Sequence, residues 1–149
     1  MMMTAERVIA RPAKNVFEFF SDASNNPKWQ QGMVSCRWTS EHPIRVGSTY
    51  RQQARFMGRD VVSTFVVTRF EPGRLIEIET VESTFPIKVL REVEPVSEDS
   101  CRVSAHISGG PEKGWLKLAQ PLMARRAQAS VDADYDRLVQ LLETSASSD

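Results

Sequence analysis

The stretch from Lys113 to Glu143 reads KGWLKLAQPLMARRAQASVDADYDRLVQLLE and predicts a long amphipathic helix late in the chain. Its apolar residues recur at spacings of three and four, which gives the helix one apolar face. The residues on this face are Met123, Ala127, Val131, Tyr135, Leu138 and Leu142. Pro121 cannot take an interior position without losing a hydrogen bond and clashing with the carbonyl of residue 117. We therefore expect a short helical lead-in over Trp115–Ala119, followed by a kink or a fresh start.

Before this helix, the chain largely shows the period of two that is typical of β-strands. A strand over Thr4–Ala10 comes first, and Pro12 then suits the first turn of a helix over Ala13–Phe20. A further short helical turn is expected at Lys28–Gln30. The later strands that the pattern predicts are 33–42, 48–57, 61–70, 75–81, 85–94 and 101–108. Short turns join successive strands, so neighbouring strands must be antiparallel.

This order of elements predicts an α+β fold in which helices cover one face of an antiparallel sheet. A long helix that follows a run of strands has to bury its apolar face against the sheet. If the sheet is curved, the helix and the sheet enclose a cavity between them. The order therefore indicates small-molecule binding, although it does not name the molecule.

The composition suits one soluble domain. The 149 residues are 41% hydrophobic and 26% charged, and 19 basic residues balance 19 acidic ones. A chain without net charge has no field of one sign to attract nucleic acid or an anionic membrane. No apolar run approaches the ~20 residues that span a bilayer, and MMMTAERVIA lacks the apolar core of a signal peptide. We expect a cytoplasmic protein.

The two cysteines, Cys36 and Cys101, have no metal-binding or redox-motif spacing. Two free, half-buried thiols are the favoured interpretation for a reducing compartment. One disulfide remains as the alternative, because both residues lie in strand-like runs that could be neighbours.

Several local sequence motifs occur in an order that, taken together, is specific for one fold. Arg11–Phe17, RPAKNVF, resembles an "xPAxxVF" opening, and Pro27–Trp29 resembles a "PxW" segment. Arg45–Ser48 is similar to an "xVGT" strand start, and Phe70–Leu75 to an "F/Y-E-P-P-x-R-L" turn with one residue fewer before the arginine. With the ending Pro121–Arg126, these segments resemble the polyketide cyclase/dehydrase-like branch of the START-related helix-grip superfamily (SRPBCC).

This resemblance implies one helix-grip domain over residues 1–149. Its curved antiparallel sheet of about seven strands would wrap over a long C-terminal helix, with two short helices after the first strand. The cavity would lie between the concave face of the sheet and that helix. Members of the superfamily include aromatic cyclases, ligand carriers, hormone receptors and partner proteins, so the fold alone does not decide the function.

The apolar side of each expected strand indicates which side chains face such a cavity, and the late helix and the early loop add others. The candidate ligand-binding residues are Trp29, Tyr50, Gln52, Ala54, Phe56, Ile78, Thr80, Phe85, Val89, Arg91, Val103, Ala105, Trp115, Leu118, Leu122 and Met123. The alternative is that these side chains fill a solid core, as most aromatic and methionine side chains do.

Polar residues among these candidates carry the chemical signal. Tyr50, Gln52 and Thr80 fall at inward positions, where each needs a hydrogen-bond partner from the protein, from water or from a ligand. A few polar groups in an apolar pocket are typical of a small-molecule site. Arg91 has the same strand parity as Val89 and is the one charged residue expected to point inward.

Catalytic machinery is not recognisable. His42 and His106 are both expected at the surface, and Glu77 and Glu79 share the outward face of one strand. The sequence contains no metal-binding spacing, nucleophile elbow, dinucleotide-binding loop or P-loop. We therefore expect no metal and no cofactor, and assign no catalytic residue.

The favoured hypothesis is a protein that binds an apolar or aromatic small molecule without a clear catalytic set. The first alternative is an enzyme of the polyketide cyclase or dehydratase type, with Tyr50, Gln52 and Arg91 at its centre. The second is a protein-interaction module, which exposed apolar residues around Trp38 or Phe65 would favour. No nucleic acid and no membrane insertion are expected, and the chain would be a monomer or a homodimer. Trp115, at the junction before Pro121, would lie at the edge of the cavity as a gate.

Overall fold

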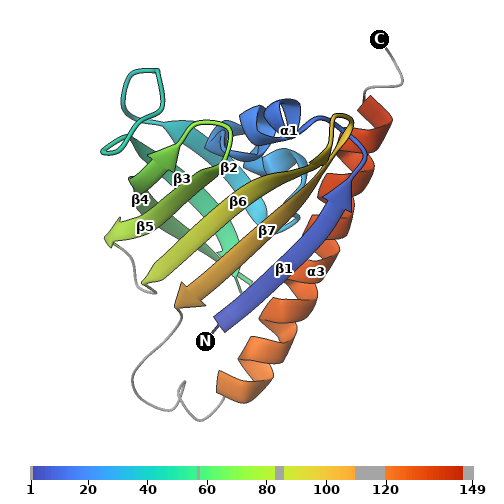
Figure 1. Cartoon of the computed structure of the whole chain (residues 1–149). Coiled ribbons are helices and arrows are strands. Elements are labelled where there is room, and N and C mark those ends of the chain that lie inside the picture. The colour runs from blue at the N-terminus through green and yellow to red at the C-terminus, as the bar shows by residue number, and fades with distance from the viewer. Residues whose placement is uncertain (1, 57, 83–85, 110–119, 146–149) are drawn as a thin grey trace.

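The computed structural model describes residues 2–56, 58–82, 86–109 and 120–145 of the chain. Within these residues, seven antiparallel strands form one sheet in the order β1-β7-β6-β5-β4-β3-β2 (Figure 1). The strands are β1 (Met2–Ile9), β2 (Met33–Trp38), β3 (Thr49–Phe56), β4 (Arg59–Glu71), β5 (Leu75–Glu82), β6 (Ile87–Ser97) and β7 (Ser100–Gly109). The helices are α1 (Ala13–Phe20), the 3-10 helix η1 (Ala23–Lys28) and α3 (Gln120–Ser145).

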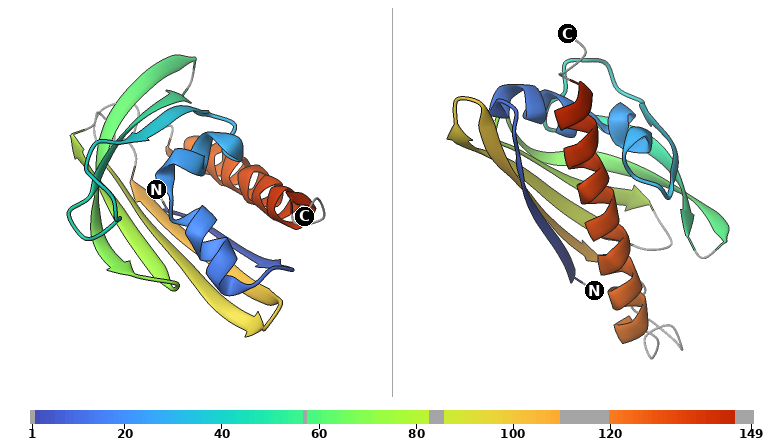
Figure 2. Two further views of the ribbon diagram at one scale, coloured as in Figure 1. Left: turned by 90° about the horizontal axis from the view of Figure 1, so that it is seen from above. Right: turned by 90° about the vertical axis from the view of Figure 1, so that its right-hand side faces the viewer.

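The sheet is strongly curved, and the helices lie on its concave side. Seen from above, it curls around the space that α1, η1 and α3 occupy, and α3 runs along β1 (Figure 2). The predicted α+β architecture, a curved antiparallel sheet that grips the late helix, is therefore confirmed. No described helix is long and apolar enough to cross a membrane.

Side chains alternate between the two faces of the sheet along each strand, and those on the concave face are largely the ones that the sequence predicted. In β3, Tyr50 is buried while its neighbour Arg51 is exposed, and in β6 the same holds for Val89 and Lys88. Several register shifts occur in the described sheet, and one of them reverses the faces along β4. The register of β4 against β5 shifts between Val67 and Arg69, which is the signature of a β-bulge that turns later side chains to the other face. Consequently Phe70 packs against the buried clusters inside the sheet.

The described part of helix α3 spans Gln120–Ser145 and includes Pro121. The kink or fresh start expected before Met123 therefore stays a prediction. The lead-in predicted over Trp115–Ala119 lies outside the described residues.

Two clusters of buried side chains form the core. The first lies beneath α1 and the later part of α3, and the second lies among β3, β4, β5 and β6. Members of the first that are fully buried include Ile9, Val103, Ala105 and Leu138. Cys101 belongs to this cluster and Cys36 packs against the second, and both thiols are free. The disulfide alternative is therefore wrong.

The outward face of β5 departs from expectation at Glu77. This side chain was expected in solvent, but only 8% of the residue is exposed. Its Oε1 accepts a hydrogen bond of 2.8 Å from Thr68, and Arg69 and Lys88 each approach Oε2 to 3.9 Å. The long side chains of neighbouring strands thus cover the carboxylate, which strand parity alone does not reveal.

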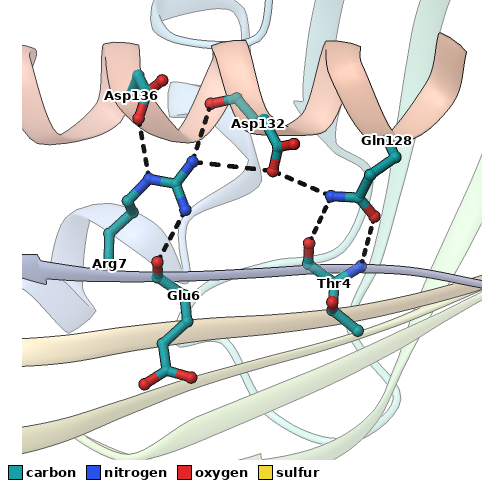
Figure 3. A network of polar contacts seen from close by, with 6 residues as sticks. All are labelled: Thr4, Glu6, Arg7, Gln128, Asp132 and Asp136. Atoms are coloured by element: carbon teal, nitrogen blue, oxygen red, sulfur yellow. Dashed lines mark hydrogen bonds and ion pairs between the residues drawn. The ribbon is translucent and has the colours of Figure 1, made fainter. Parts of the chain in front are cut away.

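Polar contacts join the open edge of β1 to α3 (Figure 3). Arg7 Nε donates to Asp136 at 2.9 Å. Gln128 makes two bonds to the backbone of Thr4: its Oε1 accepts from the N–H at 3.1 Å and its Nε2 donates to the carbonyl at 2.7 Å. The amide of Gln128 thus satisfies the strand edge as a further strand would.

Candidate functional site

A cavity of about 160 Å³ lies between the concave face of the sheet, the segment around η1, and α3. Most of its lining is apolar. The residues around it are Asn26, Trp29, Gln30, Met33, Tyr50, Gln52, Phe65, Ile78, Ile87, Val89, Arg91, Ile107, Val131, Asp134 and Tyr135. An apolar cavity of roughly 150 Å³ is large enough to hold benzene. The cavity therefore has room for about one aromatic ring.

A larger hollow of about 380 Å³ lies elsewhere, around Arg74, Val93 and Arg102. Its lining is dominated by charged side chains that already have partners, such as Arg102 with Glu6 at 3.0 Å. Its lining is more polar than apolar, unlike that of the smaller cavity. The smaller cavity is the better candidate, because ligand sites are mostly apolar with a few polar groups that fix the ligand.

Six of the predicted site residues lie around the cavity. They are Trp29, Tyr50, Gln52, Ile78, Val89 and Arg91. Thr80 is instead bonded within the sheet, where its hydroxyl accepts from the backbone N–H of Ile87 at 3.0 Å. Ala54 is half-buried on β3 but does not line the cavity.

The remaining predicted residues are elsewhere. Val103 and Ala105 are completely buried in the first core cluster, because α1 and α3 cover that part of the sheet. Met123 is buried without lining the cavity, and Leu122 is 56% exposed on the outer side of α3. The side chain of Phe56, together with Phe85, Trp115 and Leu118, lies outside the described residues.

Sequence reasoning missed the contributions of η1 and of the middle of α3. Asn26 stands in the run SNNP, residues 24–27, which is typical of a turn, and it was not among the candidate residues. Val131 and Tyr135 were placed on the apolar face of the late helix, but the cavity was assigned to the first turns of that helix. One signal was available: a tyrosine on an apolar stripe carries a hydroxyl that needs a partner.

Arg91 has the most unusual environment in the cavity wall. The residue is 7% exposed, and its Nη1 donates to the Phe20 carbonyl at 2.9 Å and to Asn26 Oδ1 at 3.1 Å. The guanidinium lies 5.0 Å from the ring centre of Phe20 and 5.1 Å from that of Trp29, within cation–π range. Its Nε has no hydrogen-bond partner. No carboxylate of the described residues is within 4.0 Å of its nitrogens.

Two buried tyrosines lie around the same cavity. Burial raises the pKa of Tyr135 to about 12 and that of Tyr50 well above its usual range, although the charge of Arg91 opposes both shifts. Arg91 also interacts with the Tyr135 hydroxyl through its side chain, which opposes the rise in the pKa of that phenol. Tyr50 stacks on Phe65 with ring centres 5.1 Å apart, and Tyr135 packs edge-on against Trp29, also at 5.1 Å. Both phenols therefore remain protonated donors at neutral pH.

Asp134 brings a carboxylate to the wall, but it is already engaged. It accepts hydrogen bonds from the Gln31 backbone at 3.2 Å and from Arg137 Nη1 at 3.0 Å. Burial raises the pKa of Asp134, and these bonds oppose the rise. Cys36 lies just behind the wall, and burial raises the pKa of its thiol to about 11.

The arrangement suits binding through hydrogen-bond donation. Arg91 and the two tyrosines can hold an acceptor while the aliphatic side chains surround an apolar body. His42 and His106 are exposed, as expected. Among the described residues, no group of three or more His, Cys, Asp or Glu side chains could hold a metal ion.

Neither aromatic ring named for an interaction module is exposed. Phe65 is 2% exposed. Trp38 is half-buried, and its Nε1 donates to Asp22 at 2.7 Å. Val34 and Val62, on the same two strands, are 52% and 46% exposed, so the protein-interaction alternative stays a prediction.

Comparisons with known proteins agree with the fold. The family model described as "Polyketide cyclase / dehydrase and lipid transport" matches residues 2–143. None of the curated proteins compared with the chain matches its sequence. Solved structures match closely in shape: a protein of Thermus thermophilus has a TM-score of 0.82 at 18% identity, with 100% of both chains covered.

Two further structures have informative names. The Zhui aromatase/cyclase from Streptomyces sp. R1128 has a TM-score of 0.76 at 14% identity, covering 96% of this chain and 94% of that one. A START superfamily protein from Mycobacterium smegmatis has a TM-score of 0.70 at 15% identity, with 96% and 94% covered. At these identities the likeness establishes the fold alone.

Proposed function

This chain belongs to the polyketide cyclase/dehydrase and lipid transport family, and from that premise we propose that it binds an apolar or aromatic small molecule between the sheet and α3. The observation that carries the proposal is the cavity of about 160 Å³, whose walls are mostly apolar. Such a void loses packing contacts that a filled core would make. A ligand of about one ring would restore those contacts, and the family description makes ligand binding the expected use of the space.

The first experiment is native mass spectrometry of the purified protein, to look for a small molecule that co-purifies. The second is a thermal-shift titration with single-ring compounds: toluene, benzyl alcohol, benzamide and benzoate. A compound that binds only the folded protein raises its melting temperature by mass action. We expect at least one of the four to do so.

A matched pair of variants locates the binding. Val89→Phe places a ring at the cavity wall, whereas Val62→Phe adds the same bulk where the side chain is 46% exposed. We expect the thermal shift to disappear in Val89→Phe and to persist in Val62→Phe. The proposal would be contradicted if none of the compounds raised the melting temperature of the wild-type protein and no small molecule co-purified with it. A shift that survives in Val89→Phe would place the binding elsewhere.

A cyclase-type activity is the second candidate, because Arg91 and the protonated Tyr50 both lie around the cavity. Together they could polarise a carbonyl group of a bound substrate. Tyr50→Phe keeps the stacked ring and would abolish turnover with little change in melting temperature. Arg91→Ala is a poorer test than the sequence suggested, because its bonds to Phe20 and Asn26 also support the fold. Full turnover by Tyr50→Phe would count against this candidate.

A further inference from the structure

We propose that the occupant of the cavity is an anion: a small carboxylic acid with an apolar body of about one ring, whose carboxylate binds Arg91. This inference rests on the proposed ligand-binding function and narrows it to one chemical class. Its basis is a buried positive charge for which the described residues supply no negative partner.

The charge of Arg91 cannot be removed by deprotonation, because a guanidinium stays charged in proteins. A buried charge is unfavourable unless it is paired and hydrogen-bonded. Here the partners are neutral: the Phe20 carbonyl, the Asn26 amide oxygen, the Tyr135 hydroxyl and two aromatic rings. They solvate the guanidinium in part and leave its net charge uncompensated.

Two buried donors of the cavity-lining residues have no acceptor among the described residues. Arg91 Nε and Trp29 Nε1 are buried without a partner, and both residues line the cavity. No hydrogen bond donated by the hydroxyl of Tyr50 or Tyr135 is found within the described residues, and neither phenol ionises at neutral pH. Buried donors in native proteins are nearly always satisfied. A carboxylate, which only accepts, complements this set.

The acidic groups of the described residues do not fill this role. Asp134 is the one carboxylate among the cavity-lining residues, and its Oδ1 is 3.0 Å from Arg137 Nη1. Its charge is therefore matched by an arginine that does not line the cavity. Cys36 stays a neutral thiol at physiological pH, since burial raises its pKa to about 11. The charge of Arg91 remains available to a ligand.

The space limits the rest of the ligand. Ile78, Val89 and Ile107 present aliphatic surface to a volume of about 160 Å³. A planar ring fits such walls and such a volume. Benzoate combines a ring of this size with a carboxylate, and its carboxyl group is ionised at pH 7.5. Benzamide has almost the same shape and no charge, which makes the two compounds a matched pair.

The test uses isothermal titration calorimetry of the wild-type protein at pH 7.5, in buffer without acetate or citrate. We expect benzoate to bind at least about tenfold more tightly than benzamide, because a hydrogen bond to a charged group is stronger than one between neutral groups. In ¹H–¹⁵N spectra, benzoate should shift the indole N–H signal of Trp29. This comparison needs no variant, so a folding defect cannot obscure it.

One near-isosteric variant tests the role of the charge. Asn26→Asp places a carboxylate oxygen where the amide oxygen now lies, 3.1 Å from Arg91 Nη1. With this internal anion, benzoate and benzamide should bind with about equal affinity, since the guanidinium is then already paired. Asn15→Asp makes the same change at an exposed position on α1 and should keep the preference.

The outcomes separate the two proposals. Equal affinity of the wild type for benzoate and benzamide would overturn the anion assignment while leaving ligand binding intact. A preference that persists in Asn26→Asp would also overturn it, since Arg91 would not be the source. If none of the single-ring compounds binds, this inference fails, and if no small molecule co-purifies either, the proposed function fails with it.

Discussion

At the scale of single residues, the ionisation of the Cys36 thiol depends on its buried place behind the cavity wall. Its Sγ lies 3.9 Å from Asn26 Nδ2 and 4.0 Å from Gln52 Oε1. Burial raises the pKa of the thiol from 9.0 to about 11, against smaller opposing effects of Asn26 and Arg91. The folded protein therefore holds this proton in a range of pH where the unfolded chain has lost it.

This difference makes stability depend on alkaline pH. Because the folded pKa is raised, the contribution is fully present below pH 9 and is lost as the pH rises toward 11. Serine does not ionise in this range. Between pH 8 and 11 we therefore expect the free energy of unfolding of Cys36→Ser to fall by about 1–2 kcal/mol less than that of the wild type, since water screens part of the full effect. Urea unfolding at each pH measures the difference. Parallel curves for the two proteins would contradict it.

At the scale of elements, the junction of β1 and α3 depends on Gln128, whose amide bonds both backbone groups of Thr4 (Figure 3). We expect Gln128→Ala to lower the free energy of unfolding by about 1 kcal/mol, because two backbone groups lose their protein partner and hydrogen-bond to water instead. It should also speed hydrogen exchange of the Thr4 amide, measured by NMR.

Gln140→Ala is the matched control, since Gln140 is exposed on the same helix. It should change neither quantity. An unchanged exchange rate at Thr4 in the Gln128 variant would show that this contact does not protect the strand edge.

The elements show what local pattern can predict. Helix α1 was predicted with the bounds Ala13–Phe20, because Pro12 and the spacing of Val16, Phe17 and Phe20 are local signals. The bulge in β4 was not predicted, because it arises from the pairing of β4 with β5 rather than from its own residues. A second short helix was predicted, but at Lys28–Gln30, whereas η1 spans Ala23–Lys28. Its position was missed because Asn26 is buried against residues of distant strands.

At the scale of the whole molecule, one half of the interior is closely packed and the other contains the cavity. Ile9 is completely buried in the first core cluster, while Ile78 is 6% exposed and lines the cavity. We expect Ile9→Ala to lower the free energy of unfolding by about 4 kcal/mol and Ile78→Ala by about 2 kcal/mol, because a side chain beside a void loses fewer contacts. Chemical denaturation of both variants measures this, and equal losses would contradict the division.

The same division explains the limits of the site prediction. Strand parity identified Tyr50, Val89 and Arg91 as inward, and they do line the cavity. Parity does not tell where along the sheet the helix crosses, so Val103 and Ala105 were chosen although α1 and α3 cover them. For the same reason Leu122 was chosen in place of Tyr135. The crossing point depends on packing between distant segments, which no single segment encodes.

The position of β1 has a consequence for biosynthesis. This strand is the first described element to leave the ribosome, yet its sheet partner is β7, with Ile9 opposite Cys101. The ion-pair partners of its charged residues are also synthesised late, since Glu6 pairs with Arg102 and Arg7 with Asp136. Contacts so distant along the chain close late and slow folding. β1 therefore remains unpaired until β7 has been synthesised, and the charges of Glu6 and Arg7 discourage other chains from pairing with it in the meantime.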